Sequence, residues 1–200
     1  MKKIVFLFAA VTLFACKSNH EKEETPEAID TTEVVEKNDT EAINTEIPDP
    51  EEEGEVMLLG KIDRTGLQTE AFNDWFQENR NAHVLDSAAV NLMKPFLNDI
   101  SIKVFMGTWC EDSQREVPAL FKILDAAAFD DEQVEMIAMS HDKDTPQGFE
   151  EGHEVEYVPT IIFMKEGKEM NRIVEYAQET LELDMLRILK GAPYTHAYAE

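Results

Sequence analysis

The stretch that decides the fold runs Trp109-Cys110-Glu111-Asp112-Ser113. It follows the mostly apolar run Ile100–Met106, which predicts a buried strand, and it precedes apolar residues at helical spacing, which predict a helix over residues 111–128. We therefore expect Cys110 at the corner between a strand and a helix N-terminus. Unpaired backbone N–H groups and the helix dipole stabilise a thiolate at such a corner, and the thiolate is the nucleophilic form of cysteine.

A second motif, Val158-Pro159-Thr160, lies some fifty residues further on and opens a predicted strand over residues 157–164. A turn at Lys165-Glu166-Gly167-Lys168 and a return strand over residues 169–176 follow it. Taken in this order, the motifs resemble the active site, the cis-proline loop and the hairpin of the thioredoxin family. The resemblance covers roughly residues 70–190 and is strongest with a Trp-Cys-x-Asp-Ser branch among Bacteroidetes envelope lipoproteins.

The pattern predicts an α/β fold, a thioredoxin-like mixed β-sheet with helices on both faces. Aromatic residues at Phe72, Trp75 and Phe76 have helical spacing. Asp86 and Thr180 are predicted to cap helices that begin at residues 87 and 181. Further elements are expected as a helix over 87–97, a strand over 134–140, a short helix starting at Thr145-Pro146, and a last helix over 181–190.

The resemblance also implies a role for each site residue. Cys110 is the nucleophile, Trp109 shields its sulfur, and Ser113 can donate a hydrogen bond to its thiolate. Val158, Pro159 and Thr160 form the substrate-binding loop, with a cis bond before the proline that leaves the Val158 backbone free to pair with an extended peptide. The alternative for Cys110 is a buried structural cysteine, and the alternative for Pro159 is an ordinary loop proline.

Two positions depart from the dithiol thioredoxins that the chain resembles. Ser113 stands where they have a second cysteine, so the chain has no thiol there to resolve a mixed disulfide. Val104 stands where they have a buried acid that transfers protons. We therefore expect that an adduct at Cys110 is released only by an external thiol. Glu111 and Asp112 also oppose a thiolate at Cys110, and they favour neutral or basic substrates.

Residues 1–15 are predicted to be a lipoprotein signal peptide. Two lysines precede about a dozen apolar residues, too few to span a bilayer as a helix, which needs about 20. The sequence Leu13-Phe14-Ala15-Cys16 resembles the bacterial lipobox, which implies cleavage before Cys16 and a diacylglycerol thioether with further acylation, such as palmitate, on that residue. The alternative is an ordinary signal peptide with a chance cysteine. A thioether sulfur has no thiol chemistry, so Cys16 is excluded from any redox role.

Residues 16–56 are predicted to be a disordered acidic tether, and residues 57–200 the thioredoxin-like domain. Residues 17–56 hold 15 acidic residues against three lysines and contain no Phe, Tyr or Trp. Such a segment buries too little apolar surface to offset the entropy of ordering. A solvated spacer is favoured over a binding segment for a cation or a basic partner.

The strongly negative net charge of the chain limits which kinds of molecule it is expected to bind. The chain has 42 Asp and Glu against 18 Lys and Arg, a net charge of −24, so we expect no binding to nucleic acid. No cofactor and no metal site are predicted. His141 follows a strand next to the Cys110 strand and could lie at the edge of the site, but with Cys110 it supplies only two ligands, and a solvated loop histidine is favoured.

Two functions remain open from the sequence. The first is thiol-disulfide exchange, either reduction or isomerisation, through Cys110 on envelope proteins that carry cysteines or disulfides, with an external thiol or dithiol as reductant. The second is a non-catalytic peptide- or protein-binding module. In either case the lipid anchor implies attachment to the cell envelope. Lys17 and Ser18, which follow the lipid site, imply the outer membrane, in a periplasmic or a surface-facing position.

Overall fold

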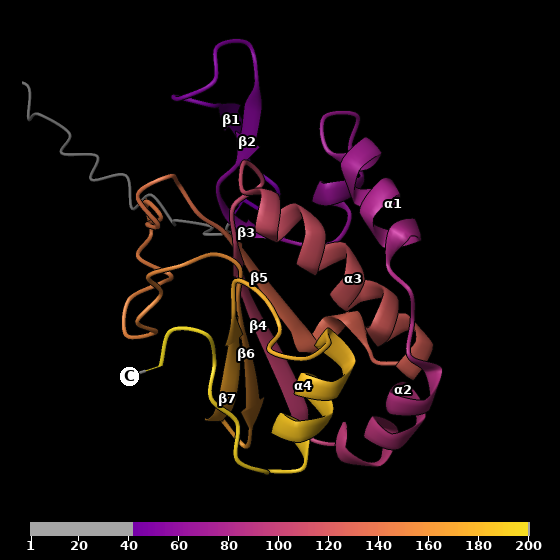
Figure 1. The fold of residues 1–200 in the computed structure, drawn as a ribbon. Helices are drawn as coiled ribbons and strands as arrows, with labels where there is room; N and C mark the ends of the chain where they lie inside the picture. The colour runs from indigo at the N-terminus through magenta and orange to yellow at the C-terminus, as the bar shows by residue number, and fades with distance from the viewer. Residues whose placement is uncertain (1–41, 200) are drawn as a thin grey trace, which may run out of the picture. The chain divides into compact units, whose positions relative to one another are not determined.

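The computed structural model of the chain describes residues 42–199 (Figure 1). Its helices are α1 (Asn73–Ala82), α2 (Ser87–Met93), α3 (Glu111–Ala127) and α4 (Leu181–Leu189). Its strands are β1 (Glu46–Pro48), β2 (Val56–Leu58), β3 (Gly60–Ile62), β4 (Ile100–Met106), β5 (Val134–Ala138), β6 (Thr160–Lys165) and β7 (Lys168–Val174). Three short 3₁₀ turns cover Gly66–Gln68, Lys94–Phe96 and Asp131–Gln133.

Five strands form a mixed sheet in the order β3-β5-β4-β6-β7. Only β4 and β5 run parallel, while the other neighbouring pairs are antiparallel. The predicted strand Ile100–Met106 is confirmed as β4, the central strand, and the predicted hairpin at residues 165–168 is confirmed as the turn between β6 and β7. The sheet places the C-terminal end of β4, where Cys110 follows, beside the N-terminal end of β6, where Pro159 precedes, because Phe105 pairs with Thr160.

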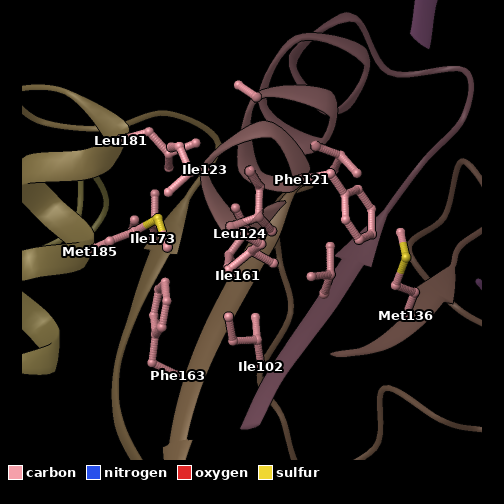
Figure 2. Close-up of a cluster of buried hydrophobic side chains, with 14 of the residues drawn as sticks. Ile102, Phe121, Ile123, Leu124, Met136, Ile161, Phe163, Ile173, Leu181 and Met185 are labelled. Carbon is pink, nitrogen blue, oxygen red and sulfur yellow. The ribbon is translucent and has the colours of Figure 1, made fainter. Parts of the chain in front are cut away.

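All four α-helices contribute to one large core on a single face of the sheet. Figure 2 shows Phe121, Ile123 and Leu124 of α3 pointing towards strand residues, with Leu181 and Met185 of α4 beside them. The predicted caps are confirmed: Asp86 accepts hydrogen bonds from two backbone N–H groups of α2, and Thr180 accepts one from α4. The helix predicted over 87–97 ends at Met93, because Pro95 shifts the chain into a 3₁₀ turn.

The opposite face of the sheet carries a second, smaller core and no α-helix among residues 42–199. Its centre is Phe105, Ile137, Met139, Val158 and Ile162. The loop of residues 139–159 completes it with Phe149 and Val155, and this loop lies across the sheet from the helices in Figure 1. The prediction of helices on both faces, with one starting at Thr145-Pro146, is therefore wrong. Gly148 and Gly152 have positive φ values, and Thr145 closes a turn in place of a helix.

The ordered part of the chain begins earlier than predicted. The tether was expected to extend to residue 56, but β1 lies within that range and pairs with β2 in a separate two-stranded sheet. We call residues 44–58 the N-terminal arm. Its composition is acidic and polar, yet Met57 and Leu58 are buried and the Leu58 N–H donates to the Thr108 hydroxyl over 3.1 Å. These few specific contacts thus offset the entropy cost of ordering the arm, although its average composition predicts disorder.

The signal peptide, Cys16 and tether residues 17–41 lie outside the described residues. Within residues 42–199, every helix is too short or too polar to cross a membrane.

Candidate active site

Cys110 is the N-cap residue of α3, at the corner between strand and helix that the sequence predicts. The turn after β4 is closed by a hydrogen bond from the Cys110 N–H to the Gly107 carbonyl, and the Cys110 carbonyl accepts the first helical bond, from Gln114. Cys110 is half-buried, and it is the one cysteine among residues 42–199, where it forms no disulfide. Cys110 thus has the helix N-terminus beside it and is partly exposed to solvent as a residue.

The cis-proline loop contacts Cys110. The Val158–Pro159 peptide bond is cis, and the Cys110 thiol donates a hydrogen bond of 3.2 Å to the Val158 carbonyl. This contact brings together two motifs that are 48 residues apart. It also means that the Val158 carbonyl, expected to be free for a peptide, is occupied while Cys110 is protonated.

Ser113 is fully buried one turn into α3, and its hydroxyl oxygen accepts a hydrogen bond of 3.2 Å from the Gly107 N–H. The predicted hydrogen bond from Ser113 to Cys110 does not occur among the hydrogen bonds of the described residues. Ser113 therefore holds the active-site turn onto the helix and presents no second reactive group.

Trp109 is fixed against the same turn. Its indole N–H donates to the Met139 carbonyl over 3.0 Å, and its ring lies close to Gly107. A Cβ atom at position 107 would come within 2.5 Å of the indole Cε2 atom, so only glycine leaves room for the ring. Trp109 and Cys110 both pack against the smaller core.

His141 does not lie in solvent, as the sequence predicts, but against the active-site turn. Its imidazole stacks on the Trp109 indole, with ring centroids 4.3 Å apart and an interplanar angle of 23°. Its Nε2 atom lies 2.9 Å from a carboxylate oxygen of Asp49 in the N-terminal arm. The side chain is only 16% exposed, so it is part of the wall of the site. Residues 42–199 contain no group of three or more His, Cys, Asp or Glu side chains placed to hold a metal.

The charges next to Cys110 are partly paired. Glu111 and Asp112 occupy the first turn of α3, and Asp112 forms an ion pair of 2.6 Å with Arg115. Arg115 also bonds to Glu116, whose pKa is nevertheless raised above its usual range because burial disfavours its charged form. The opposition of Asp112 to a thiolate is thus weaker than the sequence suggests, since a cation lies beside it.

Val104 is fully buried in β4, where it belongs to the large core and pairs with Met136 and Ile161 on the neighbouring strands. Its surroundings are apolar, as expected for a site without an internal acid. Thr160 is also buried, and its hydroxyl donates to the Tyr157 carbonyl over 2.7 Å. Thr160 therefore shapes the cis-proline loop from within, whereas the sequence predicts that it contacts substrate.

An acidic cavity of about 260 Å³ adjoins Trp109. Asp49, Glu52 and Glu55 of the N-terminal arm line it together with Trp75 of α1. Tyr198 near the C-terminus stacks on Tyr157 of the cis-proline loop, with centroids 4.1 Å apart. Both features come from segments outside the two motifs.

Sequence reasoning missed the contributions of the N-terminal arm. Asp49 lies in an acidic run whose average composition indicates a spacer. The one local signal is Ile47, an apolar residue beside Pro48 and shortly before Val56, Met57 and Leu58. Such spacing is compatible with a short hairpin, but it does not indicate that the hairpin docks on the active-site turn.

With this geometry in place, comparisons with known proteins identify the family. The sequence profile of the family described as thioredoxin matches residues 68–187, so the chain belongs to the thioredoxin family. The N-terminal arm lies outside the matched residues.

Two solved structures with TM-scores of 0.51 and 0.50 share the fold. A protein of unknown function from Pseudomonas aeruginosa is similar with a TM-score of 0.51 and 17% identity, over 67% of this chain and 94% of that one. An HIV epitope-scaffold is similar with a TM-score of 0.50 and 18% identity, over 67% and 94%. Mitochondrial thioredoxin 3 from Saccharomyces cerevisiae has a TM-score of 0.30 and 24% identity, over 48% of this chain and 86% of that one. The curated proteins contain no match.

Proposed function

We propose that this chain carries out thiol-disulfide exchange through the single cysteine Cys110. The observation that supports this most is the contact between the Cys110 sulfur, at the N-terminus of α3, and the Val158 carbonyl on the cis-proline loop. It joins a helix N-terminus that favours a thiolate with a backbone segment that an extended peptide can pair with. Membership of the thioredoxin family supports thiol-related chemistry in the same place.

The exchange step follows from the chemistry of thiols. Cys110 loses its proton to solvent, and its thiolate attacks one sulfur of a disulfide. A bond forms between that sulfur and the Cys110 sulfur, the original S–S bond breaks, and the leaving sulfur departs as a thiolate that takes a proton from water. Loss of the Cys110 proton also ends its hydrogen bond to the Val158 carbonyl, which becomes available to a backbone N–H of the bound peptide.

Release of the adduct then needs a thiol from outside the chain. Ser113 offers a hydroxyl, which does not attack a disulfide, and Val104 offers no base. A small thiol or a dithiol partner, as its thiolate, therefore attacks the substrate's sulfur in the mixed disulfide, forms a new disulfide bond with it, and expels Cys110 as a thiolate. Isomerisation, in which the substrate's own second thiol performs this attack, needs only one thiol from the enzyme.

We further propose that the substrates are neutral or basic envelope proteins and that the chain is lipid-anchored at Cys16. The carboxylates of Asp49, Glu52 and Glu55 at the cavity beside Trp109 support a basic substrate. The lipobox-like sequence before Cys16 supports an anchor in the outer membrane, and the Trp-Cys-x-Asp-Ser motif supports a place among Bacteroidetes envelope lipoproteins. On this proposal, residues 17–41 separate the domain from its membrane.

A second candidate is a peptide-binding module without turnover. The buried, hydrogen-bonded Ser113 favours it, because this residue gives the site no means to complete a catalytic cycle alone. The two functions differ in whether Cys110 is needed for turnover or only shapes a groove.

Turnover of a mixed-disulfide peptide distinguishes the two functions. With a basic peptide disulfide and excess glutathione, the full chain is expected to speed release of the reduced peptide at least tenfold over glutathione alone. Cys110→Ser is expected to return the rate to that of glutathione alone, because the oxygen does not form the adduct. If the wild-type chain binds the peptide but does not change its reduction rate, the exchange proposal is wrong and the binding module remains.

A further inference from the structure

The Trp109 indole is covered by a side chain that the N-terminal arm holds in place. His141 stacks on the indole, while its Nε2 atom lies 2.9 Å from Asp49 Oδ1 and its Nδ1 atom lies 3.3 Å from Glu51 Oε2. Lys143 adds a cation 5.5 Å from the centre of the indole ring. The arm, the His141 loop and the active-site turn therefore form one continuous set of contacts that ends at the residue next to Cys110.

Asp49 is placed for this role by its burial and its partners. Its side chain is only 3% exposed, and its carboxylate accepts a hydrogen bond of 2.8 Å from the Glu51 N–H in addition to its bond with His141. Burial alone would raise the pKa of Asp49, but the Glu51 N–H and the contact with His141 hold it below its usual range. The carboxylate is thus charged at neutral pH and fixes both the turn of the arm and the imidazole.

We propose that Asp49 and His141 are positioning residues that hold Trp109 against the Cys110 turn, so that the N-terminal arm sets how open the Cys110 sulfur is to an incoming disulfide. This inference rests on the proposed function of Cys110 as the reacting group. It goes beyond that function, because it assigns a role in the site to a segment outside residues 68–187, which match the thioredoxin family.

Cys110 is half-buried, and its exposure depends on how firmly its neighbours are held. Trp109 immediately precedes Cys110 in the chain, and both residues pack against the smaller core. The indole stacks on an imidazole whose orientation depends on its hydrogen bond to Asp49 and its contact with Glu51 in the arm. Without Asp49 the imidazole loses its 2.9 Å anchor and gains rotational freedom, and the indole loses a constant neighbour. The sulfur then becomes more open, and the effect is larger for a bulky reagent than for a small one.

The test uses the full chain with Trp75→Phe, which leaves Trp109 as its single tryptophan because the sequence has two. Asp49→Ala and His141→Gln remove the contact from either side. Asp49→Asn keeps an oxygen that accepts the same hydrogen bond but removes the charge. Glu53→Ala is the matched control, because Glu53 is an exposed acid in the same arm. Each chain is first checked for a wild-type circular dichroism spectrum.

Two readouts follow, and neither depends on turnover. The first is Trp109 fluorescence, which a stacked imidazole quenches. The second is the rate at which the Cys110 peptide, followed by mass spectrometry, reacts with neutral 4,4′-dithiodipyridine and with the smaller iodoacetamide. We expect Asp49→Ala and His141→Gln to raise the emission at least 1.5-fold and the dithiodipyridine rate at least threefold, with less than a 1.5-fold change for iodoacetamide. Asp49→Asn and Glu53→Ala should stay within 1.5-fold of the parent throughout.

The inference is overturned if His141→Gln and Asp49→Ala match Glu53→Ala in both readouts. It is also overturned if Asp49→Asn fails to restore the parental values, since the hydrogen bond would then not be what holds the indole. If Asp49→Ala does not fold, His141→Gln and Asp49→Asn still decide the outcome. Because small reagents report on Cys110 directly, a failure of peptide turnover would refute the proposed function and leave this result standing.

Discussion

Replacing Ser113 with cysteine is expected to shorten the lifetime of a mixed disulfide at Cys110 by at least tenfold in the absence of external thiol. Residues three positions apart on a helix are neighbours on its surface, with about 5–6 Å between their Cβ atoms. Cys110 and position 113 have this relationship in α3. A thiol at position 113 could therefore attack the Cys110 sulfur, form an internal disulfide and release the substrate as a free thiol.

The lifetime is measured by loading Cys110 with a peptide thiol, removing excess reagent and following the intact mass of the chain. Ser113→Ala is the control, because it removes the hydroxyl that accepts the Gly107 N–H without adding a thiol. If the control shortens the lifetime as much as Ser113→Cys does, the effect comes from a loosened turn. If neither substitution shortens it, the absence of a second thiol is not what preserves the adduct.

Replacing Val104 with aspartate is expected to lower the free energy of unfolding at pH 7 by about 3 kcal/mol or more. Val104 is fully buried in the large core. Its strand neighbours Met136 and Ile161 have no side-chain group that could form a hydrogen bond with a carboxylate. A carboxylate at this position is desolvated without compensation, so its pKa should lie above the ordinary value of about 3.9. The folded state then binds more protons than the unfolded state, and the destabilisation grows as the pH rises above about 4.

Urea unfolding of Val104→Asp and its neutral isostere Val104→Asn, at pH 4 and pH 7, checks this prediction. The difference between the two variants should be small at pH 4 and should increase towards pH 7, because only the aspartate ionises. An equal difference at both pH values would mean that the core accommodates a charged group at this position. In that case the chain would lack an internal acid for reasons other than the apolar packing around Val104.

The sequence predicted the parts of the fold that depend on local patterns. The apolar run that became β4, the capping residues Asp86 and Thr180, and the Gly167 turn each carry a signal within a few residues of the structure they form. The cis bond before Pro159 was also expected, but through resemblance to a family, and the contact of Cys110 with the Val158 carbonyl follows no local rule, since it joins residues 48 apart.

The features that were missed depend on long-range packing. The N-terminal arm has the composition of a spacer, yet buried Met57 and Leu58 and the pairing of Asp49 with His141 order it against the domain. His141 was expected in solvent because its stacking partner, Trp109, is 32 residues away in the chain and comes close only through the parallel pairing of β4 and β5. The expected helix after Thr145 was overridden by two glycines with positive φ.

The central claim is that Cys110 forms a mixed disulfide that the chain does not release on its own. The most direct measurement is the intact mass of the full chain after reaction with a peptide disulfide, followed over hours in thiol-free buffer and again after glutathione is added. The account predicts one peptide adduct, mapped to Cys110, which persists until glutathione removes it. Absence of an adduct, or its spontaneous loss before any thiol is added, would contradict the account.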